Sequence, residues 1–63
     1  MEFQLSVIIP TLNEEKNIAD IIDFINQEKI KVEIIISDAD STDKTKQIAA
    51  AKGAKIVNSK NAS

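Results

Sequence analysis

Two hydrophobic periods alternate along the chain. Short runs over 5–9, 32–37 and 54–57 are apolar at nearly every position and rich in β-branched residues, which is typical of strands buried in a parallel sheet. Between the first two runs, Ile18, Ile21, Ile22 and Ile25 recur at the i, i+3, i+4, i+7 spacing of an amphipathic helix. The pattern predicts a helix over 14–27, a second helix before Gly53, and the order β-α-β-α-β.

The ends of the first strand and first helix follow from single residues. Pro10 should end the strand over 5–9, because proline cannot donate a hydrogen bond to a sheet ladder. Asn13 is a good N-cap, and Glu14 and Glu15 would then lie in the first turn, where carboxylates favour the helix dipole. We therefore read Asn13 and Glu14 first as capping residues.

The second helix has comparable signals at both ends. Either Ser41 or Asp40 could cap it, with Asp43 in its first turn. Thr45 is expected on its buried edge, and Gly53 occupies the position where a left-handed residue ends a helix. The lysines of this segment are expected on a solvated helix face; they are Lys44, Lys46 and Lys52.

These elements predict an α/β fold, a Rossmann-like β-α-β-α-β unit with a three-stranded parallel sheet. If the spatial strand order is 3-2-1, both helices cover one face of the sheet. The other face then exposes isoleucine, whether Val7 and Ile34 or Ile8 and Ile35 point outward. We expect that face to need a cover, either more chain or a second copy.

Size and composition narrow the possible functions. The 63 residues allow one domain, with the unit over 1–58 and a polar tail over 59–63. The chain has no cysteine and no histidine, so disulfides are excluded and a zinc site is not expected. The net charge of −2, with no basic block, argues against nucleic-acid binding. No run reaches the length of a membrane span and no signal peptide is recognisable, so we expect a cytoplasmic location.

Side chains that could bind a ligand are concentrated directly after the second strand. Asp38, Asp40, Ser41 and Asp43 follow the apolar run directly and precede the second helix. Open α/β sheets place their ligands at such strand-to-helix loops. Helix capping alone explains Asp40, Ser41 and Asp43, so Asp38 is the strongest candidate for contact with a ligand.

Two motifs in the right order make the pattern specific. Pro-Thr-Leu-Asn-Glu stands at 10–14 after the first strand, and Asp-Ala-Asp-Ser-Thr-Asp-Lys-Thr stands at 38–45 after the second. Gly-Ala-Lys-Ile-Val at 53–57 completes the match. Together they resemble the N-terminal part of family 2 glycosyltransferases, which have the GT-A fold. The resemblance covers essentially the whole chain and only the beginning of such an enzyme.

The resemblance implies that the chain is the donor-binding segment of an enzyme that transfers a sugar from a nucleotide-sugar to an acceptor. The loop at Pro10 and Thr11, together with Asp38, would hold the uridine or guanosine of a UDP- or GDP-sugar, with Asn13 and Glu14 beside the same crevice. Asp40 stands where the family most often has glycine, which raises the question whether the backbone there has a positive φ. The nucleotide-binding residues predicted in this way are Pro10, Thr11, Asn13, Glu14, Asp38 and Asp40.

The resemblance also implies what these residues lack. Asp38 and Asp40 spell Asp-x-Asp, but the family's metal motif follows a later strand, as does its catalytic base. Mn²⁺ or Mg²⁺ is therefore expected for a full-length family enzyme, while no metal ligand and no catalytic residue is assigned here. We expect no transferase activity from these residues alone, and membrane association of a longer parent is left open.

Two other functions remain open at this stage. The chain could be a truncated, non-catalytic α/β module that forms a homodimer through its uncovered sheet face or edge. It could also be half of a dinucleotide-binding or receiver-like domain, although no Gly-x-Gly-x-x-Gly follows the first strand. We rank the last alternative lowest.

Overall fold

The computed structural model describes residues 4–59 of the chain. The elements are β1 (Leu5–Thr11), α1 (Ile18–Asn26), β2 (Val32–Asp38), α2 (Thr45–Ala51) and β3 (Lys55–Asn58). The α/β class and the β-α-β-α-β order are therefore confirmed. The rest of the predicted tail, 60–63, lies outside the described residues.

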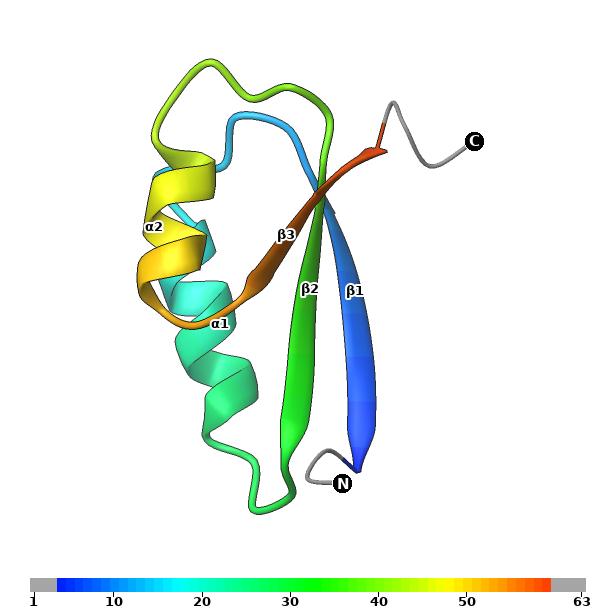
Figure 1. Cartoon of the computed structure of the whole chain (residues 1–63). Helices are drawn as coiled ribbons and strands as arrows, with labels where there is room; N and C mark the ends of the chain where they lie inside the picture. The colour runs from blue at the N-terminus through cyan, green and yellow to red at the C-terminus, as the bar shows by residue number, and fades with distance from the viewer. Residues whose placement is uncertain (1–3, 60–63) are drawn as a thin grey trace.

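The three strands form one parallel sheet in the order β1-β2-β3, with β2 in the centre. Both helices cover the same face of this sheet, as expected from two right-handed crossovers (Figure 1). The register pairs Thr11 with Asp38 and Asp38 with Asn58. The carboxyl ends of the three strands thus bring polar residues into one row.

The hydrophobic core lies between the sheet and the helices. Its buried members come from α1, β2 and α2; they are Ile18, Ile22, Ile34, Ile36 and Ala49. Because side chains alternate along a strand, Ile34 and Ile36 point to the helices and Ile35 points away from them. The structure thereby decides between the two orientations that the sequence left open.

The outer sheet face carries the opposite set of side chains. By register this face comprises Ser6, Ile8, Pro10, Glu33, Ile35, Ser37, Lys55 and Val57. Ile8 is 66% exposed and lies beside Ile35. No helix among residues 4–59 packs on this face (Figure 1).

The prediction that Pro10 ends the first strand is wrong. β1 continues through Pro10, which pairs with Ser37, and ends at Thr11. β1 is an edge strand of the described sheet, and an edge tolerates proline because one side of the strand has no ladder to satisfy. β2 also extends one residue beyond its predicted end, to Asp38, and β3 is displaced by one residue to Lys55–Asn58.

The N-terminus of the first helix was also misplaced. α1 begins at Ile18 rather than Glu14, after a turn in which the Glu14 carbonyl accepts hydrogen bonds from the amides of Asn17 and Ile18. Asn13 does not cap α1, and its backbone has a φ of +53°. The Asn13 side chain is instead directed to the loop before α2.

In α2, one capping prediction is wrong and another is confirmed. Neither Asp40 nor Ser41 caps the helix, which begins at Thr45. Asp43 lies two residues before the helix and not in its first turn as predicted, and it accepts a hydrogen bond from the Thr45 amide at 2.9 Å. At the other end, Gly53 has a φ of +90°, and the amides of residues 53 and 54 bond to the carbonyls of residues 50 and 49. This is the glycine-terminated helix end that the sequence predicted.

Candidate functional site

The candidate site lies at the carboxyl edge of the sheet, around the side chain of Asp38. This carboxylate is 1% exposed and receives three hydrogen bonds. The hydroxyls of Thr11 and Ser41 donate to Oδ1 at 2.6 Å and 2.7 Å, and the Ser41 amide donates to Oδ2 at 2.7 Å. Asp38 therefore joins the end of β1, the end of β2 and the loop that follows.

These contacts determine the charge state of Asp38. Burial alone raises the pKa of its carboxyl group, because a charged group loses hydration. The hydrogen bonds from Thr11 and Ser41, with the positive charge of Lys46, outweigh burial and hold the pKa below its ordinary value of 3.8. Asp38 is thus ionised at neutral pH and can only accept hydrogen bonds.

The loops after β1 and β2 are joined by a set of hydrogen bonds that we call the loop clasp. Figure 1 shows the two loops side by side at the same end of the sheet. The clasp residues are Asn13, Glu14, Glu15, Ser41, Thr42, Asp43, Lys44 and Thr45.

The half of the clasp nearer the sheet centres on Asn13 and Ser41. The Asn13 amide donates to Ser41 Oγ at 2.8 Å, and Asn13 Oδ1 accepts from the Thr42 amide at 2.9 Å. Ser41 Oγ in turn donates a hydrogen bond to Asp38 Oδ1 at 2.7 Å. Asn13 is therefore linked to the Asp38 carboxylate through one hydroxyl group.

The half of the clasp nearer the helices centres on Thr45, which is fully buried. Its Oγ1 accepts a hydrogen bond from the Glu14 amide at 2.8 Å and donates one to Asp43 Oδ1. Asp43 Oδ2 accepts from the Glu15 amide at 3.2 Å, and Glu15 Oε1 accepts from the Lys44 amide at 2.8 Å. Desolvation is the largest single effect on the pKa of Asp43 and raises it. The hydrogen bonds from Thr45 and Glu15 together outweigh desolvation, so the pKa of Asp43 is lowered.

The structure brings some of the predicted nucleotide-binding residues together. Thr11 and Asp38 are in direct contact, while Asn13 and Glu14 belong to the clasp. Pro10 is exposed near the end of β1. Asp40 has a φ of +61°, which answers the question raised by the missing glycine, and its Oδ1 accepts a hydrogen bond from Asn58 at 3.1 Å.

A hollow of about 190 Å³ opens beside Asp38. Its other lining residues come from α2 and β3; they are Lys46, Ile56, Val57 and Asn58. Lys46 is half-buried in this hollow and not on a solvated face, which corrects the expectation for that lysine. Asp38, Lys46 and residues of β3 therefore line one concave surface, to which Val57 contributes through its backbone because its side chain lies on the outer sheet face by register.

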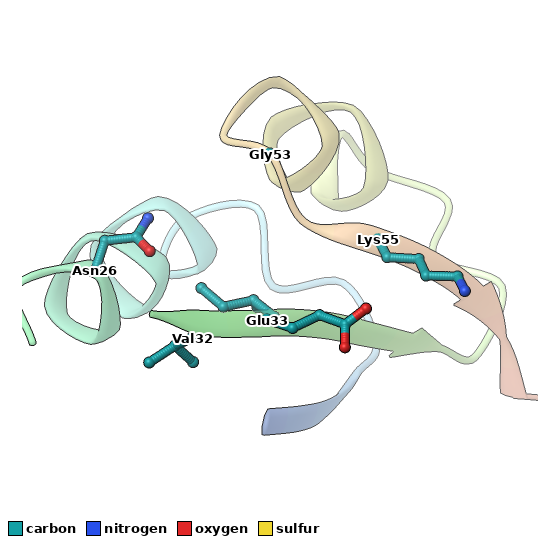
Figure 2. A pocket seen from close by; sticks show the side chains of 6 residues that line it. Asn26, Val32, Glu33, Gly53 and Lys55 are labelled. Carbon is teal, nitrogen blue, oxygen red and sulfur yellow. The ribbon is translucent and has the colours of Figure 1, made fainter. Parts of the chain in front are cut away.

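Figure 2 shows a second hollow, of about 130 Å³, beside the amino-terminal half of β2. Its lining includes Asn26, Glu33, Gly53 and Lys55. β3 begins opposite Ile35, so this hollow lies where the third strand does not extend along β2. It contains none of the predicted site residues.

The residues around Asp38 do not form a metal site. No group of three or more acidic, histidine or cysteine side chains converges anywhere in residues 4–59. The Asp38 oxygens already accept three protein hydrogen bonds, and the Asp40 carboxylate is bonded to Asn58. The described part of the chain therefore does not offer the cluster of oxygen ligands that Mn²⁺ or Mg²⁺ needs.

Sequence reasoning did not find the clasp. It assigned Asn13, Ser41 and Asp43 to helix ends, because a polar residue before an apolar helical stripe is normally a cap. Thr45 was assigned to the buried edge of a helix, which is correct, but its bond to Glu14 spans 31 residues and has no local signal. The available clue was the concentration of polar residues in both loops, amides and carboxylates over 12–17 and hydroxyls and carboxylates over 39–44.

Known proteins share this fold and these motifs. The sequence profile of glycosyl transferase family 2 matches residues 6–62. The 4,4'-diaponeurosporenoate glycosyltransferase of Staphylococcus haemolyticus is 44% identical over 54 residues, which are 86% of this chain and 14% of that protein. The enzyme of the same name from Staphylococcus aureus is 40% identical over 53 residues, again 14% of its length. The chain thus spans about a seventh of these relatives.

Solved structures agree with the sequence matches. Glucosyl-3-phosphoglycerate synthase from Mycobacterium tuberculosis, in complex with Mn²⁺, UDP and glucosyl-3-phosphoglycerate, superposes with a TM-score of 0.74 and 41% identity over 86% of this chain and 20% of that one. Mannosyl-3-phosphoglycerate synthase from Rubrobacter xylanophilus has the same TM-score with 28% identity, covering 89% of this chain and 19% of that one. The chain has the N-terminal Rossmann-like part of the GT-A fold, and it belongs to glycosyltransferase family 2.

Proposed function

We propose that the carboxyl edge around Asp38 binds the nucleotide of a nucleotide-sugar donor. The observation that carries the proposal is the ionised Asp38 carboxylate, held by Thr11 and Ser41 at the edge of a hollow that Lys46 also lines. A base with a ring N–H fits a fixed acceptor of this kind. The UDP in the complex of the similar mycobacterial enzyme supports the same ligand class.

The predicted nucleotide-binding residues have two roles in this proposal. Asp38 accepts a hydrogen bond from the base, and the exposed Pro10 and Asp40 lie at the rim of the site. Thr11, Asn13 and Glu14 act through their hydrogen bonds, because each is bonded to Asp38 or to the clasp.

The activity of the whole enzyme is also part of the proposal. Family membership supports transfer of a sugar from the bound donor to an acceptor, with Mn²⁺ or Mg²⁺ held by residues other than those described here. Within the described residues, Asp38 and the clasp bind and orient the nucleotide. We propose that this chain binds donor nucleotide in the cytoplasm and that catalysis needs further residues. No helix within residues 4–59 is long and apolar enough to cross a bilayer.

Titration with UDP tests the binding proposal. Amide chemical shifts of the ¹⁵N-labelled chain should move at residues 38–41 and 56–58 as UDP is added. Asp38→Asn should weaken binding by about 10- to 100-fold, the range for loss of a hydrogen bond to a charged group. Asp20→Asn, an exposed position on α1, is the matched control and should bind as the parent does. Absence of saturable binding at millimolar UDP would contradict the proposal.

The outer sheet face supports a second candidate, self-association of this chain. The exposed Ile8 and the half-buried Ile35 form an apolar pair there, on the same face as Pro10 and Val57. Sedimentation should show a concentration-dependent dimer that Ile8→Ser shifts to monomer. Phe24→Ser is the control, since Phe24 on α1 is 68% exposed and lies away from the sheet. A monomer at every concentration would exclude this candidate.

A further inference from the structure

We propose that two copies of this chain pack outer sheet face against outer sheet face, and that two symmetric ion pairs align them, each between Glu33 of one protomer and Lys55 of the other. The inference rests on the proposed self-association and adds how the two copies fit together. It follows from the positions of opposite charges around the apolar pair Ile8 and Ile35.

One acidic and one basic side chain stand on neighbouring strands of the outer face. Glu33 lies on β2 and Lys55 on β3, and Figure 2 shows both side chains. Glu33 Oε1 accepts a hydrogen bond from the Ser6 hydroxyl at 2.9 Å. Among residues 4–59, no ion pair joins Glu33 to Lys55, and Lys55 has no other carboxylate partner. Both charges are therefore available to a second molecule.

The strand register determines where these two charges lie. Lys55 is level with Ile35, which is two residues beyond Glu33 on β2. Neighbouring strands are about 4.8 Å apart and residues two apart on a strand are about 6.7 Å apart, so the Cα atoms of Glu33 and Lys55 are separated by about 8 Å along a diagonal of the sheet. A two-fold axis that lies between two such faces and crosses this diagonal at its midpoint, at right angles, exchanges the two positions. Each Glu33 then faces the partner's Lys55.

The same axis also brings the apolar side chains together. Measured along the plane of the interface, Ile35 falls within about 3 Å of the partner's Ile35, and Ile8 within about 3 Å of the partner's Ile8. The strands of the two sheets cross at roughly 70°, close to the orthogonal class of sheet packing. An axis along β2 would instead oppose two Glu33 carboxylates, and an axis across the strands at Ile35 would oppose two Lys55 ammonium groups. The charges therefore favour the diagonal axis.

Charge complementarity favours a second copy of this chain as the occupant of the face. The eight residues that the register places there carry one acidic and one basic side chain, so two such faces meet without net repulsion although the chain has a net charge of −2. A standard interface uses about 20–30 residues a side, so a face of this size gives a weak dimer, with an expected dissociation constant above about 1 μM.

Sedimentation of charge-reversed variants tests the pairing. Glu33→Lys and Lys55→Glu should each raise the dissociation constant of the dimer at least about tenfold, because each substitution opposes like charges twice in a dimer. An equimolar mixture of the two variants should associate again, to within about threefold of the parent chain, because both pairs of the mixed dimer join opposite charges.

Asp20→Lys and Lys29→Glu are the matched controls. They make the same changes of net charge at exposed positions, on α1 and in the turn that follows it. Each should dimerise as the parent chain does, and mixing them should add nothing. Raising NaCl from about 0.05 M to about 0.5 M should weaken the parent dimer several-fold, because salt screens the ion pairs. This measurement decides the pairing if a reversed variant does not fold.

The outcomes separate this inference from the self-association on which it rests. A dimer that neither reversal weakens, or a mixture of variants that stays monomeric, overturns the ion pairs and leaves association through the apolar residues standing. A dissociation constant that does not rise with salt also overturns the ion pairs. A parent chain that is monomeric at every concentration overturns the self-association and the inference together.

Discussion

The loop clasp leads to a sharp prediction for Thr45→Val. This substitution keeps the shape of a fully buried side chain and removes its hydroxyl group. The Glu14 amide then loses its acceptor at 2.8 Å, and Asp43 loses a donor. The clasp would lose its central connection without a cavity being formed.

The magnitude follows from those two bonds. A buried donor left without a partner costs about 1–3 kcal/mol. A domain of this length has a total free energy of unfolding of about 3–9 kcal/mol. Each kcal/mol lowers the melting temperature of so small a domain by about 4–8 °C. We therefore expect Thr45→Val to lower the melting temperature by roughly 5–20 °C.

Thermal unfolding followed by far-ultraviolet circular dichroism measures this change, since the chain has no tryptophan or tyrosine to report by fluorescence. Ser6→Ala is the control, because it also removes a hydroxyl that donates to a carboxylate, that of Glu33, at an exposed position outside the clasp. It should change stability by less than about 0.5 kcal/mol. If the two variants melt together, the Thr45 bonds are not what holds the loops.

Two further predictions concern stability. Because the pKa of Asp38 is lowered on folding, its ionised form stabilises the fold above pH 3.8, and this contribution is lost as the pH falls through the folded pKa. Urea titrations between pH 2 and 7 should therefore show a free energy of unfolding that falls at acidic pH, and the fall should be smaller for Asp38→Asn. An equal dependence of stability on pH in the two chains would contradict the assignment. Gly53→Ala should lower the free energy of unfolding by about 1–2 kcal/mol through the positive φ alone, since no atom lies within 4 Å of the added Cβ. An unchanged melting temperature would show that this helix end tolerates alanine.

The fold was predictable because its signals are local. β-branched apolar runs indicate strands, and Ile18 and Ile22 at helical spacing indicate the buried face of α1. Element ends were less accurate, because Pro10 and Asn13 act according to their tertiary surroundings. Pro10 is tolerated at a sheet edge, and Asn13 has its acceptor in another loop.

The candidate site was predictable only in part. Asp38 stood out because it follows a buried strand and belongs to a two-part motif. Its partners were not foreseen, since the bond from Thr11 depends on the register of two strands 27 residues apart. Lys46 was expected on a solvated face for a similar reason, because the hollow that it lines with Asp38 is completed by residues of β3, which have no local signal near Lys46.

The clasp also bears on the order of events during folding. Its cross-loop bonds join residues that are 28–31 positions apart, so each of them requires a long loop to close. We expect contacts of this range to be completed late in folding, because the entropy of loop closure is lost before they can stabilise the chain. Their loss should therefore accelerate unfolding and leave the refolding rate nearly unchanged. The residues that mark the family would then set how long the native state lasts rather than how fast it forms.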